Sequence, residues 1–262
     1  MPKEKEKQRV VLVGSDVTVG QISDWWRMIG DGTIDHETLA NILQNPKKFN
    51  KGVALVRVLK IFGVDKVITA EQVAKIYDLM TPQSVRIRYS EATLRRCAAE
   101  NKSGASDWRL IYCHGLSLRE QREKWGTDKE VQPCHHKDNT WWLKKEEDKW
   151  ANFKPEDGYY LLNFKPRFAN MKWQPQEDEI KKLGPQFERC HETIFSEAVF
   201  TNFKVNGERI AENWWHWGVS VSSIGGHVSV GSFDLDGWSV NSYYGNRCNP
   251  NLRVCLALKF EF

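Results

Sequence analysis

The sequence predicts an α+β protein, with helices prominent in the first part of the chain and strands in the last part. Apolar residues recur at i, i+3, i+4 and i+7 behind capping boxes, a spacing typical of amphipathic helices. Near the C-terminus, apolar and polar residues alternate as they do in half-buried strands. The chain has 262 residues, of which 40% are hydrophobic and 27% charged, so it is long enough to bury a sizeable core.

The charge balance is mild, with 38 basic and 34 acidic residues and a net charge of +4. This balance does not favour a nucleic-acid partner. No run approaches the roughly 18 apolar residues that a membrane-spanning helix needs, so we expect no membrane span. The N-terminus is charged and lacks an apolar segment, which predicts no signal peptide and a cytoplasmic location; another export route would place the protein at the surface.

Residues 1–8 are expected to form a charged, solvated tail, and residues 9–80 a small, mostly helical unit. A short strand is predicted over residues 10–13. Capping boxes at Thr18 and Thr69 open two of the helices, and a further helix is expected to begin near Thr33. We expect a linker at residues 81–83.

A second domain is expected over residues 83–262. Its elements are predicted from period-2 alternation and from helical spacing. The expected strands are 85–89, 108–112 and 159–164, and the expected helices are 91–100, 117–126 and 174–202, the last interrupted at Gly184-Pro185. Residues 127–158 show little periodicity and are expected to form loops.

The C-terminal segment predicts a hairpin whose two-residue turn is Gly225-Gly226. Strict alternation would place Val219, Val221, Val228 and Val230 on one face of this hairpin. The other face would carry Ser220, Ser222 and Ser229, beside Ser239 and Asn241 of the next strand. A last strand would carry Val254, Leu256, Leu258 and Phe260 on one face.

Signatures of catalysis and metal binding mostly fail. The adjacent residues Cys134-His135-His136 would point apart on an extended chain, which argues against a shared zinc site. Ser232-x-Asp234-x-Asp236-Gly237 resembles the start of a calcium loop, but its twelfth position is Tyr243 where Glu is needed, so a polar turn is expected instead. The six cysteines form no C-x-x-C pair and are expected to be reduced. We expect no catalytic residue, no metal and no cofactor.

Residues 218–251 have an unusual composition, since Ser, Gly, Asn and Tyr make up 19 of these 34 residues. Antibody paratopes use the same residue types, in which small polar groups surround rigid aromatic anchors. Composition alone nevertheless favours an ordinary surface hairpin with polar outward-facing residues.

The order of several landmarks changes this balance. Five runs follow one another near the C-terminus: Trp214-Trp215-His216-Trp217-Gly218, Val228-x-Val230-Gly231-x-Phe233, Gly237, Gly245-x-Arg247 and Val254-x-Leu256-Ala257-x-Lys259-Phe260. Upstream lie Tyr89-Ser90-Glu91-x-x-Leu94, Trp108-Arg109-Leu110-Ile111-Tyr112 and Gly115-Leu116-Ser117-Leu118-Arg119. Together they resemble the variable proteins of diversity-generating retroelements, most closely those of candidate-phyla bacteria. The resemblance covers about residues 85–262.

This resemblance implies a C-type-lectin-like domain of the formylglycine-generating-enzyme type. Such a scaffold presents a binding surface whose gene segment is rewritten at template adenines. The resemblance implies that variable ligand-binding positions are Ser220, Ser222, Ser223, Ser232, Asp234, Asp236, Trp238, Asn241, Tyr243, Tyr244, Asn246, Asn249 and Asn251. Trp238 could equally belong to the core. The implied framework is Trp214, Trp215, Trp217, Gly218, Gly231, Phe233, Gly237 and Arg247. The three Trp residues at 214, 215 and 217 are included because adenine changes in an AAC codon cannot produce Trp.

The expected function is therefore non-enzymatic binding of a protein or other macromolecular ligand. One alternative is an oxidase-like or hydrolytic enzyme on the same scaffold, using Cys248, Cys255, His216 or His227. A second is a nucleic-acid-binding adaptor acting through residues 9–80.

Overall fold

The computed structural model describes residues 55–80, 85 and 87–261. The strand expected at 10–13 and the helices expected before residue 50, with Trp25 and Trp26, lie outside these residues. One compact unit extends over Leu55–Phe262. It therefore begins well before the linker expected at 81–83, because residues 55–80 pack on the rest of this unit and Val67 pairs with Leu110.

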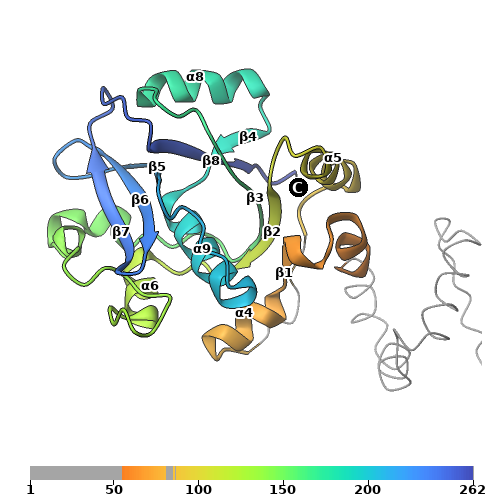
Figure 1. Cartoon of the computed structure of the whole chain (residues 1–262), viewed down its shortest axis with the longest axis horizontal. Helices are drawn as coiled ribbons and strands as arrows, with labels where there is room; N and C mark the ends of the chain where they lie inside the picture. Colours follow the sequence, from red (N-terminus) through yellow and green to blue (C-terminus); the bar gives the residue numbers. More distant parts are fainter. Residues whose placement is uncertain (1–54, 81–84, 86, 262) are drawn as a thin grey trace, which may run out of the picture. The chain divides into compact units, whose positions relative to one another are not determined.

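The first half of the unit alternates short helices and strands (Figure 1). Residues 55–62 are helical and lead into the 3-10 turn η1. The elements that follow are η1 (Val64–Lys66), β1 (Val67–Ile68), α4 (Ala70–Tyr77), α5 (Glu91–Lys102), β2 (Trp108–Cys113) and α6 (Leu118–Trp125).

Local capping signals set two of these helices. Thr69 Oγ1 accepts a hydrogen bond from Gln72 N at 3.2 Å, and Gln72 Oε1 accepts one from Thr69 N at 2.8 Å. Ser117 and Glu120 form the same reciprocal box at the start of α6. The capping box predicted at Thr69 is thus confirmed, and the box predicted at Thr18 lies outside the described residues. Each box satisfies main-chain N–H groups that a helix leaves free.

The strand predicted at 85–89 is wrong, because residues 87–89 pair with no strand. Tyr89 instead anchors this segment to the sheet through its side chain. Its hydroxyl donates to Leu258 O at 3.0 Å and accepts from Leu161 N at 3.1 Å. Ser90 then caps α5.

Residues 127–158, expected to be loops, contain three short helical segments: η2 (Trp141–Leu143), η3 (Lys145–Glu147) and α7 (Asp148–Ala151). Trp142 and Trp150 are buried there and lie 6.5 Å apart between ring centroids. Burial of these aromatic rings gives the segment order that its periodicity does not predict.

The second half supplies most of the sheet. Its elements are β3 (Gly158–Arg167), α8 (Trp173–Leu183), β4 (Phe187–Arg189), α9 (Glu192–Asn206), β5 (Trp215–Val221), β6 (His227–Asp234), β7 (Gly237–Tyr243) and β8 (Leu252–Leu258). The single interrupted helix expected over 174–202 is two helices separated by β4. The predicted interruption at Gly184 is confirmed, since α8 ends there.

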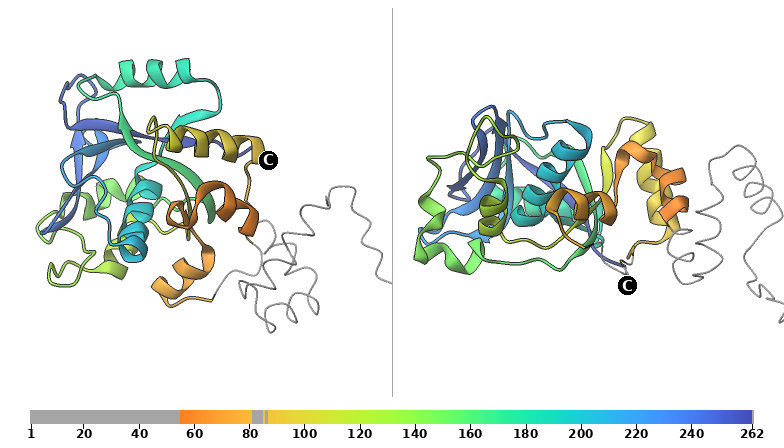
Figure 2. Two further views of the ribbon diagram at one scale, coloured as in Figure 1. Left: turned by 45° about the vertical axis from the view of Figure 1, so that its right-hand side comes forward. Right: turned by 90° about the horizontal axis from the view of Figure 1, so that it is seen from below.

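The eight strands form one mixed sheet in the order β1-β2-β3-β8-β5-β6-β7, with β4 also pairing with β8. β3 and β8 are antiparallel, β5 runs parallel to β8, and β5, β6 and β7 form an antiparallel meander. The sheet bends around α9, while α8 lies on the far side of β8 from α9 (Figures 1 and 2). None of the described helices is both long and apolar enough to cross a bilayer.

Helix α9 is buried around almost its whole circumference, by polar as well as apolar side chains. Phe195 and Phe200 pack with Trp238 in an aromatic cluster. Glu197 is fully buried and accepts hydrogen bonds from the main-chain N–H groups of His114 and Leu116. Burial raises the pKa of Glu197 to about 7, although these hydrogen bonds oppose the rise.

The predicted faces of the C-terminal hairpin are partly wrong. Val228 and Val230 are buried as expected, but Val219 and Val221 are exposed. The register shifts between Trp217 and Val221, so β5 contains a bulge that breaks the alternation. The turn is longer than two residues, since Ser222 N donates to Gly226 O. In β8 the apolar side chains line both faces, because both are covered, while Phe260 lies beyond the strand end.

Two buried histidines allow a matched test of stability against pH. Burial lowers the pKa of both His135 and His216 to about 3, and His216 also faces the charge of Arg189. Unfolded histidines bind protons below about pH 6.5, so each of the two should make the free energy of unfolding fall by up to about 1.4 kcal/mol per pH unit between 6.5 and 3. We expect His135→Phe to remove one such slope without loss at pH 7, because neither ring nitrogen of His135 has a hydrogen-bond partner within the described chain.

His216→Phe provides the matched comparison. His216 Nε2 lies 2.7 Å from Cys190 O, and Nδ1 accepts from Cys255 N at 3.1 Å. Losing these partners should cost about 1–3 kcal/mol at pH 7. Denaturant titrations between pH 4 and 7 measure both effects. Glu197 contributes in the opposite direction, because its raised pKa stabilises the fold as the pH falls from about 7. This contribution is the same in parent and variant and therefore cancels when the two are compared. Equal losses in free energy of unfolding at pH 7 for the two variants would contradict the conclusion that His216 has hydrogen-bond partners and His135 has none.

Candidate functional site

The meander of β5, β6 and β7 has one face turned toward α9 and one turned away. Paired residues of an antiparallel ladder point to the same face. Trp217, Ser229 and Asn241 are register partners and share the face that we call the outer face. The opposite face packs on α9, with the rings of His216 and Phe195 4.8 Å apart.

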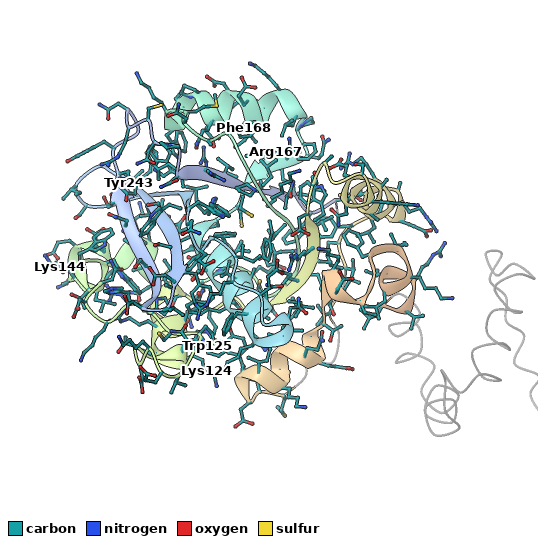
Figure 3. The ribbon with its side chains drawn as sticks, in the orientation of Figure 1. Lys124, Trp125, Lys144, Arg167, Phe168 and Tyr243 are labelled. Carbon is teal, nitrogen blue, oxygen red and sulfur yellow. The ribbon has the colours of Figure 1, made fainter. Side chains whose placement is uncertain are left out.

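The accessible part of the outer face is aromatic and polar. Trp215 and Tyr243 are half-buried, with ring centroids 6.2 Å apart in an edge-to-face arrangement. Asn241 Nδ2 donates to Tyr243 Oη at 2.9 Å, and the Arg247 guanidinium lies 4.7 Å from the centre of the Tyr243 ring. Figure 3 places Tyr243 at the β6–β7 side of the molecule. The side chains thus hold one another in place before any ligand arrives.

Beneath these groups lies a buried polar floor. Trp217 and Ser229 are fully buried, and among the described residues neither Trp217 Nε1 nor Ser229 Oγ has a hydrogen-bond partner. Trp173, at the start of α8, covers one end of the face by stacking on His227 at 4.1 Å. Buried polar atoms without partners mark places where water or a ligand is expected to complete the hydrogen bonding.

The β5–β6 turn holds three of the predicted ligand-binding residues, each with a different exposure. Ser220 is half-buried, Ser222 is buried with its Oγ 2.8 Å from Ser242 Oγ, and Ser223 is exposed. Ser223 N donates to Glu147 Oε2 at 3.0 Å, and its hydroxyl also donates to this carboxylate. Burial would raise the pKa of Glu147, but the hydrogen bonds from Ser223 and Trp150 outweigh it and lower that pKa. This turn is therefore held in place by an ionised carboxylate.

Side chains cover the open edge of β5. β8 pairs with β5 only at Trp215 and His216, which leaves the following main-chain groups without a neighbouring strand. Three side chains take the place of that strand. The contacts are Arg189 Nη1 to Trp217 O at 2.8 Å, Trp173 Nε1 to Gly218 O at 3.1 Å, and Val219 N and Ser220 N to Glu192 Oε2 at 3.0 and 3.5 Å. A side chain on Gly218 would collide with Glu192.

The remaining predicted ligand-binding positions lie elsewhere. Ser232, Asp234 and Asp236 are at the β6–β7 turn, where Asp234 Oδ1 accepts from Asp236 N at 2.9 Å, which confirms the predicted polar turn. The loop between β7 and β8 carries a further group of half-buried and exposed residues: Tyr244, Asn246, Asn249 and Asn251. The predicted positions thus form three separate groups besides the outer face.

The prediction that Trp238 is a ligand-binding residue is wrong, because its side chain is buried and cannot contact a ligand directly. Its side chain is 0% exposed and packs among Phe195, Phe200 and Phe233 on the α9 face of the sheet. Among the predicted framework residues, Trp214, Trp217, Gly218, Gly231, Phe233 and Gly237 are buried, Trp215 is half-buried, and Arg247 is exposed.

The residues that the enzyme alternative would use differ in exposure. His216 and Cys255 are buried, and both nitrogens of His216 are engaged by the main chain. Cys248 is exposed, and its Sγ donates to Asn170 O at 2.8 Å. Across residues 55–80, 85 and 87–261, no three His, Cys, Asp or Glu side chains are grouped so as to hold a metal.

Sequence reasoning missed a hollow beside the β5–β6 turn. It has a volume of about 360 Å³ and is lined by Lys149, Trp150, Phe153, His191, Ser220 and Val221. These residues come from three distant segments, so no sequence motif joins them. The aromatic and charged composition of residues 141–153 is the only signal in the sequence for its wall.

Comparisons of the chain with protein-family models, with curated proteins and with solved structures found no match.

The different environments of Trp238 and Tyr244 yield a direct test. Trp238→Ala should lower the free energy of unfolding by about 3–5 kcal/mol, because it empties an aromatic cluster. Tyr244→Ala should change it by less than about 0.5 kcal/mol, because Tyr244 is 60% exposed. Denaturant unfolding of both variants measures the difference. A tolerated Trp238→Ala would place that ring outside the core.

Proposed function

We propose that this protein is a non-enzymatic ligand-binding protein whose binding surface is the outer face of the β5–β6–β7 meander and the adjoining β7–β8 loop. We further propose that the domain is C-type-lectin-like and that its gene segment for residues 218–251 is diversified by a retroelement. The ligand would be a protein or another macromolecule.

The strand connectivity supports the fold part of this proposal. The resemblance implies a scaffold that carries its binding surface near the C-terminus. Here β3 and β8 pair antiparallel, α8 and α9 lie between them in the sequence, and the β5–β6–β7 meander precedes the loop that leads to β8. The landmark runs that begin at Trp214, Val228 and Val254 fall mainly on β5, β6 and β8, Gly237 begins β7, and residues 108–112 fall on β2.

The observation that carries the binding function is the outer face itself. Trp215 and Tyr243 present large, rigid rings, and Asn241 presents an amide that its neighbours hold in place. Aromatic side chains with restricted rotamers lose little entropy on binding and dominate interface energetics. Beneath them Trp217 and Ser229 are fully buried, so they form the floor of this face and do not themselves contact a ligand.

Burial narrows the set of residues that we propose to contact ligand. Asn241 and Tyr243 remain from the sheet, and the β7–β8 loop contributes Tyr244, Asn246 and Asn249. We do not include Trp238 or Ser222, whose side chains are buried, or the Asp234–Asp236 turn, which lies at the far end of the hairpin.

Two libraries of variants test the proposal. One randomises Asn241, Tyr243, Tyr244, Asn246 and Asn249, and a matched library randomises five buried framework positions: Trp214, Trp217, Gly218, Gly231 and Phe233. We expect the first library to keep most members folded, within about 1 kcal/mol of the parent in free energy of unfolding, because none of its five side chains is fully buried. It should also yield binders to an unrelated protein such as lysozyme when selected by surface display.

The framework library should lose folded protein, since Gly231 packs against the main chain of Trp214 and Trp215. If both libraries lose folded members equally, the surface is not a variable one.

A genomic observation tests the retroelement part separately: the coding segment for 218–251 should have a near-copy that differs at adenines beside a reverse-transcriptase gene. Close relatives that are identical at the five positions would contradict diversification.

A further inference from the structure

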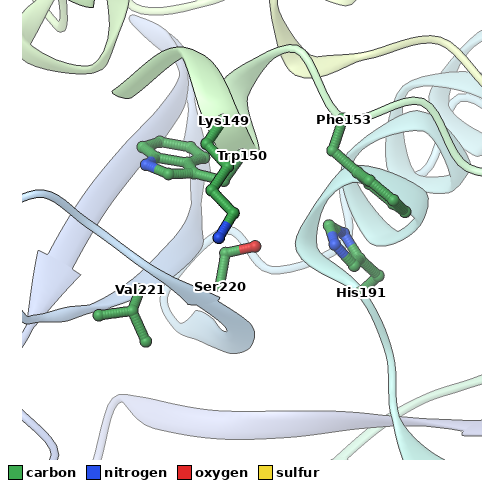
Figure 4. Close-up of a pocket in the computed structure, with 6 residues that line it drawn as sticks. All are labelled: Lys149, Trp150, Phe153, His191, Ser220 and Val221. Atoms are coloured by element: carbon green, nitrogen blue, oxygen red, sulfur yellow. The ribbon is translucent and has the colours of Figure 1, made fainter. Parts of the chain in front are cut away.

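The hollow beside the β5–β6 turn is separate from the outer face and has a different chemistry. Its volume of about 360 Å³ falls in the range of roughly 300–1,000 Å³ that small-molecule sites occupy. Figure 4 shows the ammonium group of Lys149 and the hydroxyl of Ser220 turned toward each other, with the rings of Phe153 and His191 on the other side. This volume is large enough for one amino-acid-sized group.

Lys149 supplies a positive charge that the neighbouring carboxylates do not neutralise. Asp148 pairs with Arg119 at 2.6 Å, and Glu147 is occupied by Ser223 and Trp150. None of the ion pairs formed by the described residues includes Lys149. A lone ammonium group at the wall of a hollow favours an anionic ligand.

His191 adds a second donor. Its Nδ1 accepts a hydrogen bond from Thr193 N at 3.2 Å, because His191 caps the start of α9. Burial lowers the pKa of His191 although Glu192 opposes the shift, so the ring is neutral at pH 7 and its proton lies on Nε2. The ring of Phe153 stacks on it at 4.3 Å and fixes its plane. The hollow is therefore lined by Nε2–H, an ammonium group and the Ser220 hydroxyl, all of which can donate.

The other walls are apolar. Phe153 is 42% exposed and Val221 is 52% exposed, which is high for such side chains, and Trp150 closes the base. Exposed apolar side chains that gather around a concave site indicate a ligand that buries them. The hollow thus combines donors for an anion with surfaces for an apolar group.

We propose that this hollow binds a carboxylate that is carried on an apolar or aromatic group, with Lys149 and His191 holding the carboxylate and Phe153 and Val221 covering the apolar part. The carboxylate next to His191, that of Glu192, is directed to the N–H groups of Val219 and Ser220. The larger hollow, of about 560 Å³, does not suit the same ligand because its walls include Asp128, Asp138 and Asp236. The proposal does not depend on the outer-face function.

Isothermal titration of the full chain with 3-phenylpropionate and with its neutral amide tests this site. We expect the acid to bind and the amide to bind about 10-fold more weakly, since a charge-assisted contact contributes about 1.4 kcal/mol or more. Lys149→Met should lower the affinity for the acid about 10-fold and leave the affinity for the amide unchanged. Lys149→Arg should keep most of the affinity for the acid. Lys145→Met, in the same segment but outside the hollow, is the matched control and should bind as the parent does.

A second arm identifies the source of the carboxylate. N-acetyl-Ala-Phe with a free C-terminus, compared with its C-terminal amide, represents the end of a peptide chain. Tighter binding of this peptide than of 3-phenylpropionate supports a peptide C-terminus, and the reverse order supports a small aromatic acid. Any of three results overturns the proposal: equal affinity for acid and amide, a loss of binding in Lys145→Met as large as in Lys149→Met, or no binding of either acid. Thermal unfolding of each variant shows that the fold is retained.

Discussion

The architecture depends on how α9 is buried. This helix lies inside the bend of the sheet, and two of its carboxylates accept hydrogen bonds from the main chain of other segments. Glu197 holds the connection between β2 and α6, and Glu192 holds β5. Burying a carboxylate without hydrogen bonds or a counter-charge is unfavourable by several kcal/mol, so each glutamate specifies where its partner segment must lie. One helix thereby fixes both halves of the sheet, and the position of the proposed binding surface depends on that helix.

The two candidate binding sites use this framework differently. On the outer face, the aromatic and amide side chains hold one another, so the surface is organised by contacts among its own residues. In the hollow, the groups come from the α7 region, the start of α9 and the end of β5, so their geometry depends on the packing of all three. Glu147 connects the two by anchoring Ser223 at the turn between them. Changes at Asn241, Tyr243 and the β7–β8 loop can therefore leave the hollow intact, because the hollow is lined by the α7 region, the start of α9 and the end of β5.

The parts of the fold that the sequence predicts are those governed by local rules. The capping boxes at Thr69 and Ser117 and the alternation in β6 and β7 act over a few residues, and they are found where the spacing indicates. The bulge in β5 could not be predicted, since it depends on Glu192, which lies far away in the sequence and occupies the strand edge. The burial of Trp238 likewise follows from its position opposite Phe195 and Phe200, and alternation within one strand cannot say which face meets a helix. For the candidate site, the composition singled out residues 218–251, but it did not indicate which of their side chains face outward.

The covered edge of β5 has a consequence for behaviour at high concentration. An exposed strand edge offers unpaired main-chain groups to another molecule, and intermolecular strand addition of this kind leads to aggregation. Here a carboxylate, a guanidinium group and an indole occupy those groups before another chain can reach them. All three side chains lie outside residues 218–251, so substitutions within that segment leave this protection in place, except at Gly218, where a side chain would collide with Glu192. The edge of β5 therefore stays covered whichever side chains the other positions carry.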